Sequence, residues 1–416
     1  MFKFVHTADV HLDSPLKSLS LRDPEAGEVI ANATRQSFSG IIDLCLEEGA
    51  DALLIAGDLY DGDMNSVKTA GFFAAEMRRL NEGGVQVFIV KGNHDAESKV
   101  TRHLVLPENV HIFSARGETV DLQNYGIAIH GLSFKNISAP DSLLPMYPAP
   151  MAERINIGLL HTSLAGYAEH DSYSPCSVQN LIDFGYDYWA LGHIHKRTVH
   201  HQSAPVIVMP GIPQGRSIKE SGPKSVTIGF VHDNGQIDIE ERPVQVAQFE
   251  RIEVDVSGLS DMRDLVECLD IALGEAVPRI ECGLLVARLN LVGSTPLAPR
   301  LERDLDLVLE EARQAAARAG KAFVELVELD VSNESQGRQS TLPIDELASL
   351  MKVDELQATK EHLRQILDPL TSKLPLEVRN ALAPSGTIEG EMLNEWARRG
   401  MQKVIARLVI DDRESQ

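Results

Sequence analysis

The sequence lacks several features that would mark other classes of protein. No apolar run in its 416 residues approaches the ~18 residues that a membrane helix needs, so an integral membrane protein is not expected. The opening residues, MFKFVHTADVHLD, place His6, Asp9 and His11 where a secretion signal would need an unbroken apolar stretch, which favours a cytoplasmic protein. The four cysteines form no C-x-x-C pair and are too sparse for a disulfide framework.

Positive charge is also scarce. The chain has 39 Lys and Arg against 61 Asp and Glu, a net charge of -22 that is divided equally between residues 1–240 and 241–416. A bulk electrostatic attraction to nucleic acid is therefore excluded. Histidine is almost missing from the second part, because 13 of the 14 histidines lie before residue 240. A site that needs imidazole is therefore expected in the first part.

The length argues for two or three domains. The first ~240 residues repeat short runs of Val, Ile and Leu that end in Gly, Asp, Asn or His, which is typical of strands buried on both faces. The predicted strands are 2–5, 52–56, 85–90, 127–130, 155–160, 188–191, 206–209 and 226–231. Helical segments 27–48 and 66–81 lie between the earlier runs and favour an α/β architecture. Asn234-Gly235 predicts a hairpin that closes this domain near residue 245.

The second part has a different texture. It predicts a small α+β domain, 246–335, with elements in the order βαβαβ: strand 251–256, helix 261–273, strand 284–292, helix 301–318 and strand 322–331. The polar stretch 332–340 is interpreted as a linker. A C-terminal helical segment, 341–416, follows, with helices expected at 344–367 and 388–410.

Polar side chains gather where the predicted strands end. The segments are Asp9-Val10-His11, Gly57-Asp58, Gly92-Asn93-His94-Asp95, His161 and Gly192-His193-Ile194-His195. Since the carboxyl ends of strands in an open α/β sheet meet at one crevice, we expect these five segments to lie together.

Each segment alone has a plain structural explanation. A D-x-H triplet occurs by chance about once in a chain of this length. Asp58 could be a turn or cap residue, His161 a hydrogen-bonded core histidine, and G-H-x-H the edge of a hairpin. G-N-H-D is rarer, since four specified residues in a row occur by chance in well under ~1% of such chains. The shared position at strand ends favours a functional interpretation of the whole set.

The number of candidate ligands indicates the number of metal ions. Seven side chains are too many for one tetrahedral zinc but suit two ions that share a carboxylate: Asp9, His11, Asp58, Asn93, His161, His193 and His195. A mixed oxygen and nitrogen set without thiolate suits manganese, iron or zinc. Two metals ~4 Å apart lower the pKa of a bridging water and hold the oxygens of a phosphorus centre. The sequence therefore predicts phosphoester hydrolysis.

The order of these motifs resembles the calcineurin-like metallophosphoesterase superfamily. Within it, HTADVHLDSPL, AGDLYD, VKGNHD, LGHIHK and PGIPQGRSIKESGPK resemble the SbcD-type DNA repair exonucleases, in particular their YhaO-like branch. The resemblance covers the first ~240 residues well and the remainder in layout. It implies a two-sheet sandwich flanked by helices for residues 1–245, a small capping domain after it, and two divalent ions, with Mn²⁺ favoured over Fe²⁺, Zn²⁺ or Mg²⁺.

The resemblance also implies roles for individual residues. One ion would be held by Asp9, His11, Asp58 and His195, and the other by Asp58, Asn93, His161 and His193. A hydroxide between the ions would be the nucleophile. His94 would be the catalytic histidine, and Asp95 would orient it by accepting an imidazole N–H bond. Chemistry alone also favours His94, since a departing alkoxide needs a proton and a histidine beside a metal ligand can supply it.

DNA would need a local basic surface on so acidic a chain. Residues 196–224 offer a net charge of +4, from Lys196, Arg197, Arg216, Lys219 and Lys224 against Glu220. Gly211 and Gly215 flank Arg216 in a segment whose backbone could approach a phosphate. A solvated loop without a ligand is the alternative.

Three functions remain open. The first is a metal-dependent DNA exonuclease or endonuclease of the SbcD or YhaO type, and the second is a metallophosphoesterase for a small phosphodiester, a cyclic nucleotide or a phosphoprotein. The third, a non-catalytic scaffold, is disfavoured because no ligand position is missing. By resemblance we expect a homodimer and an SMC-like coiled-coil ATPase partner of the SbcC or YhaN kind, bound through segment 341–416.

Overall fold

The computed structural model describes residues 1–14, 32–61, 67–96, 105–136, 139–164, 173–281 and 283–332, together with isolated positions between 365 and 404. The predicted linker after residue 332 lies outside the described residues, as do nearly all of the predicted C-terminal helices 344–367 and 388–410. In the described part of the chain, no helix combines the length and the apolarity that crossing a membrane requires.

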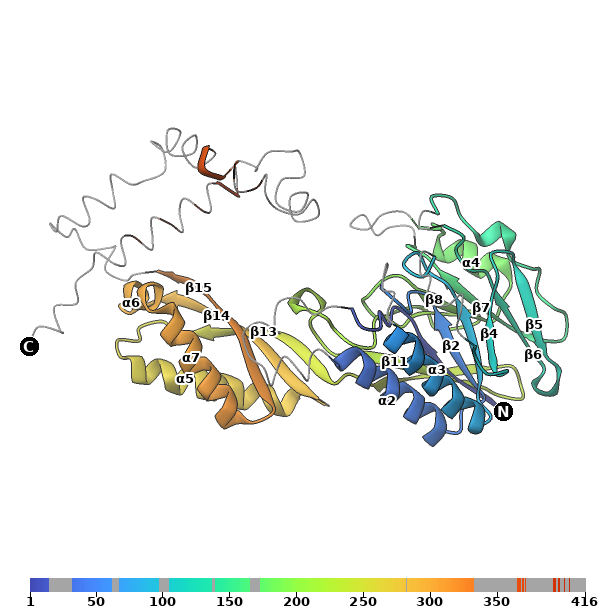
Figure 1. Ribbon diagram of the computed structural model, residues 1–416, viewed down its shortest axis with the longest axis horizontal. Helices are drawn as coiled ribbons and strands as arrows, with labels where there is room; N and C mark the ends of the chain where they lie inside the picture. Colours follow the sequence, from blue (N-terminus) through green and yellow to red (C-terminus); the bar gives the residue numbers. More distant parts are fainter. Residues whose placement is uncertain are drawn as a thin grey trace, which may run out of the picture. The chain divides into compact units, whose positions relative to one another are not determined.

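Two six-stranded sheets form most of the first part (Figure 1). In the first sheet the strands lie in the order β12 (Ile237–Pro243), β11 (Ser225–Val231), β1 (Phe2–Thr7), β2 (Ala52–Ala56), β3 (Gln86–Val90) and β4 (Val110–Ile112). In the second the order is β5 (Glu118–Leu122), β6 (Ile127–Gly131), β7 (Ile155–His161), β8 (Tyr188–Gly192), β10 (Val206–Met209) and β9 (Thr198–His201). Strands β1 to β4 are parallel, and so are β6, β7, β8 and β10.

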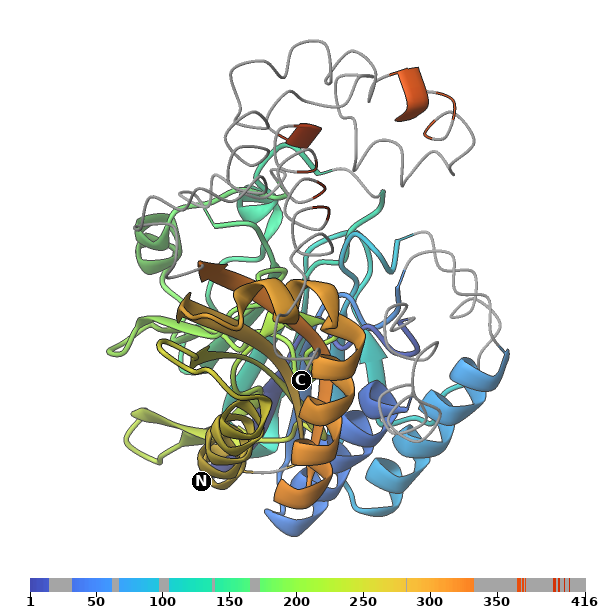
Figure 2. The same ribbon diagram turned by 90° about the vertical axis from the view of Figure 1, so that its left-hand side faces the viewer.

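Helices cover the outer face of each sheet, so this part has four layers. Side chains of α2 (Ala33–Glu47) and α3 (Val67–Glu82) pack against one face of β1, β2 and β3. The opposite face of these strands packs against the second sheet through residues such as Phe4, Leu54 and Tyr188. α4 (Val178–Phe184) packs against the outer face of the second sheet. Figure 2 shows α2 and α3 from a second direction. The two-sheet sandwich flanked by helices is confirmed.

The apolar runs predict these central strands well because both faces of each strand are buried. Within β1, for example, Val5 contacts the helices and Phe4 contacts the other sheet. The predicted hairpin after β11 is also confirmed, since β11 and β12 are antiparallel and His232 donates its backbone N–H to Gln236. Strands β4, β5 and β9 were not predicted, because their residues are only partly buried and are more polar.

A buried histidine ties the two sheets together close to the strand ends. His6 of β1 lies 3.0 Å from the hydroxyl of Tyr188 and 3.0 Å from the carbonyl oxygen of Leu191, both on β8. Burial lowers the pKa of His6 to about 3, so its ring is neutral and can both donate and accept a hydrogen bond. His6 is therefore a structural histidine.

A three-stranded sheet follows, in the order β13 (Ala247–Asp255), β14 (Leu284–Ser294) and β15 (Ala322–Ser332). Its helices are α5 (Met262–Ala276), α6 (Ala298–Arg303) and α7 (Leu305–Ala319). The element order agrees with the prediction, except that the expected helix 301–318 is divided at Asp304, whose φ of -108° and ψ of 33° are not helical.

The chain divides into two compact units, which are described separately. Unit 1 comprises Met1–Arg251, Ala276–Ala287 and Lys321–Glu325, and unit 2 comprises Ile252–Glu275, Arg288–Gly320 and Leu326–Gln416. The first residues of β13, β14 and β15 thus belong to unit 1. There, Ile218 packs with Ala247 and Phe249 of β13, Val286 of β14 and Phe323 of β15.

Candidate metal centre

The loops that follow β1 and β2 lie side by side at the carboxyl end of the first sheet. The backbone N–H of Asp9 donates to the carbonyl of Gly57 at 2.9 Å, and that of His11 donates to the carbonyl of Asp58 at 3.0 Å. The loop after β8 joins them, since both carboxylate oxygens of Asp9 accept from the backbone N–H of His193, at 3.1 and 2.9 Å. Strand ends from both sheets therefore meet at one place.

Backbone conformation marks the same place. Asp9, His11, Asp58 and His193 have positive φ angles of 52°, 45°, 50° and 103°. Such angles are uncommon in residues other than glycine and cost on the order of 1–3 kcal/mol each. The surrounding hydrogen bonds must therefore hold these four residues in conformations that aim their side chains at the site.

Asp9, His11 and His195 form the first group, with ligand atoms within 4.8 Å of one another. The Nε2 atoms of His11 and His195 face each other at 3.3 Å. His195 Nδ1 lies 2.8 Å from Glu220 Oε1, so Nδ1 carries the proton and Nε2 presents a lone pair. Burial, together with the charge of Arg216, lowers the pKa of His11 to about 3, which keeps this ring neutral as well.

Asp58, His161 and His193 form the second group. His161 Nδ1 donates to the carbonyl of Ala56 at 2.9 Å, which directs Nε2 toward Asn93 Oδ1 at 3.0 Å and Asp58 Oδ2 at 3.4 Å. Burial by itself would lower the pKa of His161, but the Asp58 carboxylate raises it to about 9. A ring nitrogen thus meets two oxygen acceptors, an arrangement that a cation stabilises.

All seven candidate ligands predicted from the sequence therefore come together as two adjoining groups. Asp9, His11, Asp58, Asn93 and His161 are buried, and their donor atoms are carboxylate, amide oxygen and imidazole. Burial raises the pKa of Asp9 to about 6, so bringing this carboxylate to full charge in the site requires compensation. The donor set fits divalent cations of the manganese, iron or zinc type.

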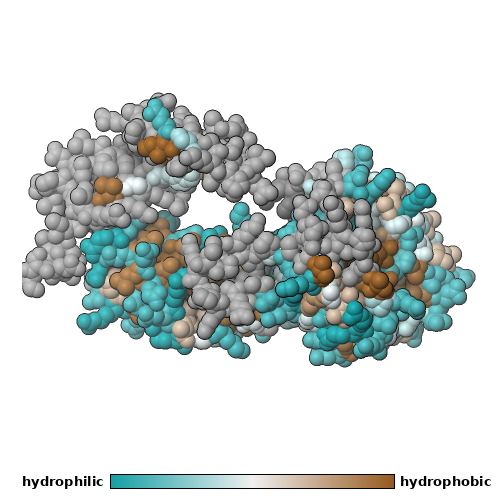
Figure 3. Space-filling model, in the orientation of Figure 1, coloured by the Kyte–Doolittle hydropathy of each residue, from teal (hydrophilic) through white to brown (hydrophobic). Residues whose placement is uncertain are grey.

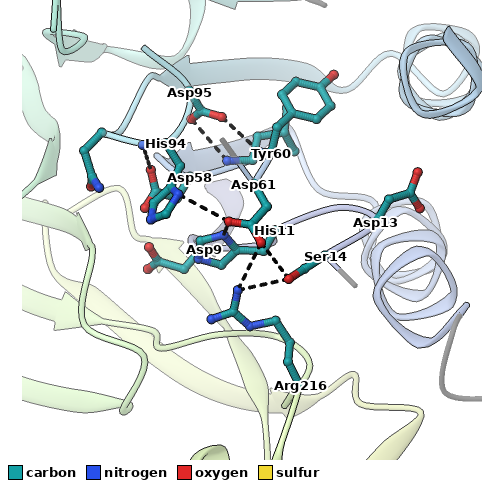
Figure 4. Close-up of polar contacts among 12 residues, drawn as sticks. Asp9, His11, Asp13, Ser14, Asp58, Tyr60, Asp61, His94, Asp95 and Arg216 are labelled. Atoms are coloured by element: carbon teal, nitrogen blue, oxygen red, sulfur yellow. Dashed lines mark hydrogen bonds and ion pairs between the residues drawn. The ribbon is translucent and has the colours of Figure 1, made fainter. Parts of the chain in front are cut away.

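His94 lies at the edge of these groups with its side chain 42% exposed (Figure 4). Its Nδ1 is 3.3 Å from Asp61 Oδ1, and this contact raises the pKa of His94. Asp61 also lies 3.7 Å from His11 Nδ1 and accepts from the Ser14 hydroxyl at 2.7 Å. The ligand atoms of His11, Asp61 and His94 lie within 4.8 Å of one another, so these residues form a third set that shares His11 with the first group. No role was predicted for Asp61 from the sequence, although it is the third residue after Asp58 in AGDLYD.

The role expected for Asp95 is wrong. Its carboxylate accepts three backbone N–H groups, from Gly92 at 3.1 Å, Leu59 at 3.1 Å and Tyr60 at 2.9 Å (Figure 4). A buried carboxylate is most stable where several donors surround it, and these amides provide them. Asp95 therefore joins the loop after β3 to the loop after β2, and Asp61 is the carboxylate that faces the His94 ring.

The side chain of Arg216 contacts two acidic side chains, those of Glu220 and Asp61. Its Nη2 and backbone N–H each donate to Glu220 at 2.8 Å, and its Nη1 lies 3.9 Å from Asp61 Oδ2. The guanidinium is 20% exposed and sits beside His195, with Nη2 3.4 Å from Nδ1. Glu220 contacts both Arg216 and His195. From the sequence alone, Glu220 was counted only in the net charge of residues 196–224.

Gly211 and Gly215 serve close packing of the protein itself. A Cβ at Gly211, whose φ is 74°, would lie 2.7 Å from the carbonyl oxygen of His195. A Cβ at Gly215 would lie 2.8 Å from the carbonyl oxygen of Glu220. Packing within the protein therefore explains both glycines, and the contact of this backbone with a phosphate stays a prediction.

The basic stretch 196–224 presents less free charge than its composition indicates. Arg197 pairs with Glu241 at 3.1 Å, and the buried Lys224 ammonium donates to the carbonyls of Ser221 and Gly222 at 2.7 and 3.2 Å. Lys196 and Lys219 are exposed.

Comparisons with known proteins identify the family of this chain. A family model described as calcineurin-like phosphoesterase matches residues 2–197, and one described as metallophosphoesterase YhaO, middle domain, matches residues 249–332. The uncharacterized metallophosphoesterase YhaO of Bacillus subtilis is 33% identical over 345 residues, which cover 82% of this chain and 84% of that protein.

Two relatives with more specific names are more distant. The DNA double-strand break repair protein Mre11 of Methanopyrus kandleri is 25% identical over 233 residues, 51% of this chain and 49% of that protein. A subunit of the nuclease SbcCD from Staphylococcus epidermidis is 25% identical over 220 residues, 46% of this chain and 56% of that protein. The aligned part is thus about half of each of these two proteins. The similarity to YhaO over most of both chains shows that this chain belongs to the calcineurin-like metallophosphoesterase family, a family of phosphoester hydrolases with a dinuclear metal centre.

Proposed function

We propose that this chain is a DNA exonuclease or endonuclease that depends on two divalent metal ions, with Mn²⁺ favoured over Fe²⁺, Zn²⁺ or Mg²⁺. One ion would be held by Asp9, His11, Asp58 and His195, and the other by Asp58, Asn93, His161 and His193. The observation that carries the proposal is the pair of converging groups with an exposed His94 beside them. The relatives named as a DNA repair protein and a nuclease supply the substrate class.

When bound, the ions would supply an activated water and would neutralise charge on the phosphoryl oxygens. The chain's own residues would do the rest. His94 can donate a proton to the departing alkoxide, because its ring is accessible and Asp61 stabilises the protonated form. The ring of His11 packs against that of His94 at a centroid distance of 5.2 Å, which limits the positions that His94 can take.

Residues 1–245 would form the catalytic domain and 246–335 a domain that caps the site and limits which DNA ends enter. Segment 341–416 would dock on an SMC-like coiled-coil ATPase, and the chain would work as a homodimer. One relative is named as a subunit of a nuclease, which supports assembly with another chain. Deleting residues 341–416 should abolish co-purification of such an ATPase, and unchanged co-purification would contradict the docking role.

Phosphate contacts would come from Lys196, which is exposed one residue after His195. Arg216 would reach a phosphate only by exchanging its contacts with Glu220. Hydrophilic residues cover much of the visible face of unit 1 in Figure 3, and over the whole chain acidic residues outnumber basic ones by 61 to 39. DNA would therefore be gripped at the site mouth, where bound cations offset the acidic charge.

In the described stretch 196–224, Arg197, Arg216 and Lys224 are bound by the protein's own acidic or carbonyl groups. This favours a second candidate function, hydrolysis of a small phosphodiester or a cyclic nucleotide. An assay with added Mn²⁺ separates the two functions. End-labelled single- and double-stranded DNA should be cleaved by the wild type and not by His94→Ala. Cleavage of bis-aryl phosphate or cyclic nucleotides without any cleavage of DNA would overturn the nuclease proposal in favour of the second function.

A further inference from the structure

Glu220 contacts the candidate ligand His195 without belonging to either group. It ends the short 3-10 turn Ile218–Glu220, and its side chain is 14% exposed. One carboxylate oxygen accepts from His195 Nδ1 at 2.8 Å and from Arg216 Nη2 at 2.8 Å. The other accepts from the backbone N–H of Arg216 at 2.8 Å. This carboxylate therefore joins Arg216 to His195.

His195 Nδ1 has two neighbours of opposite character. Glu220 can only accept a hydrogen bond from it, whereas the Arg216 guanidinium, 3.4 Å away, can only donate one. A proton on Nδ1 leaves the lone pair on Nε2, which faces His11 in the first group. A proton on Nε2 would instead remove the atom through which His195 can bind a metal.

We propose that Glu220 is a positioning residue that holds His195 in the tautomer that binds a metal through Nε2, against the competing donor Arg216. The proposal rests on the proposed role of His195 as a metal ligand. Glu220 does not touch the reacting groups, and it acts only through the orientation and the protonated nitrogen of His195. A carboxylate partner for a ligating imidazole raises metal affinity in this way.

The turn that carries Glu220 is firmly placed. The backbone N–H of Glu220 donates to the carbonyl of Ser217 at 2.9 Å, and Ile218 is buried among Ala247, Phe249 and Val286. Gly215 packs directly against the Glu220 carbonyl. The carboxylate is thus pre-organised and does not have to be ordered when a metal binds.

Titration calorimetry of the metal-free full chain with Mn²⁺ tests the proposal. The wild type should bind two ions. Glu220→Ala should weaken one of the two sites by about 10- to 100-fold. The Mn²⁺ affinity of Glu220→Gln should lie between those of the wild type and Glu220→Ala, since the amide oxygen of the new side chain still accepts from His195 Nδ1. Adding Arg216→Ala to Glu220→Ala should recover part of the loss, because the competing donor is then absent.

Glu118→Ala is the matched control. Glu118 also pairs with an imidazole, that of His111 at 2.6 Å, but it lies outside both groups, and its removal should leave both Mn²⁺ affinities unchanged. If Glu220→Ala binds both Mn²⁺ ions with wild-type affinity, the proposal is overturned. If Glu220→Ala and the double variant with Arg216→Ala lose Mn²⁺ affinity equally, Arg216 does not compete for His195 Nδ1. A wild type that binds no Mn²⁺ would instead contradict the proposed function. The thermal midpoint of each metal-free variant shows whether a loss of Mn²⁺ affinity is caused by misfolding. If Glu220→Ala misfolds, the Mn²⁺ affinity of Glu220→Gln tests the proposal instead.

Discussion

At the scale of single residues, hydrogen bonds to Nδ1 orient the rings of two candidate ligands, His161 and His195. His161 uses Nδ1 for the carbonyl of Ala56, and His195 uses Nδ1 for Glu220. In both rings Nε2 is left to face the site. Because one nitrogen of each ring is fixed by the scaffold, the direction in which Nε2 points is set before any ligand arrives. His94 differs, since its Nδ1 faces Asp61 and its side chain is exposed.

This difference predicts separate effects on metal binding and turnover. His94→Ala should retain both metal ions, because His94 is not one of the seven proposed ligands, but should lose about 10²- to 10⁴-fold in kcat as the proton donor is removed. The measurement is kcat with a phosphodiester substrate, at a metal content matched by elemental analysis. Equal turnover in the two proteins would show that His94 has no catalytic role.

Asp61 should set the pH range in which His94 works. The contact with Asp61 raises the pKa of His94, and a general acid is active only while protonated. Activity that depends on His94 should therefore fall as pH rises through this pKa. In Asp61→Asn the pKa of His94 is lower, so the alkaline limb of the kcat/KM profile should move to lower pH. If kcat/KM of Asp61→Asn falls but the alkaline limb of its pH profile does not move, Asp61 has a structural role only.

At the scale of elements, the apolar runs of the first part predict the strands whose two faces are both buried and miss β4, β5 and β9. β4, β5 and β9 each lie at the edge of a sheet and are only partly buried, so their sequences lack the continuous apolar runs that identify β1, β2 and β8. The candidate ligands were predictable because each follows a central strand, and neighbouring parallel strands end at the same edge of a sheet.

Contacts made by the loops could not be predicted in this way. The partners of Asp95 and Arg216 depend on how loops from different strands pack, which no local pattern encodes. The carboxylate beside His94 was therefore assigned to Asp95, its neighbour in sequence, when it is Asp61 from another loop. The tight packing of Gly211 against the carbonyl oxygen of His195, and of Gly215 against that of Glu220, was not predicted either.

Gly192 tests how closely the two sheets meet at the site. A Cβ there would overlap the carbonyl oxygen of Ala56 on β2 and lie 2.9 Å from Ala8, so relief requires backbone movement between the sheets. Gly192→Ala should lower the free energy of unfolding by about 1–3 kcal/mol. Gly40→Ala, in α2 with no atom within 4 Å of its Cβ, should raise it by about 1 kcal/mol. Urea unfolding measures both, and equal midpoints would contradict the close approach.

At the scale of the whole molecule, charge and histidine are distributed differently. Negative charge is shared by both parts of the chain, whereas all seven candidate ligands lie within Met1–Arg251 of unit 1. The described groups that could hold a metal also lie there, at loops that join both sheets. Metal binding is therefore expected to stabilise one unit and to leave the other unchanged, because a ligand stabilises only the structure whose unfolding destroys its site.

Metal removal should reveal this asymmetry. Mn²⁺ at 100 times its dissociation constant stabilises by about 2.7 kcal/mol per site, so two sites should raise the Tm of unit 1 by roughly 10 °C or more relative to the protein in EDTA. Calorimetry measures every unfolding transition of the chain. Fluorescence of the buried Trp189 reports on unit 1, provided that Trp396→Phe leaves Trp189 as the one tryptophan in the chain. The shift should persist in His94→Ala and shrink in His161→Ala. An equal shift of every transition would mean that the ions act outside these two groups, since unit 2 contains none of their seven residues.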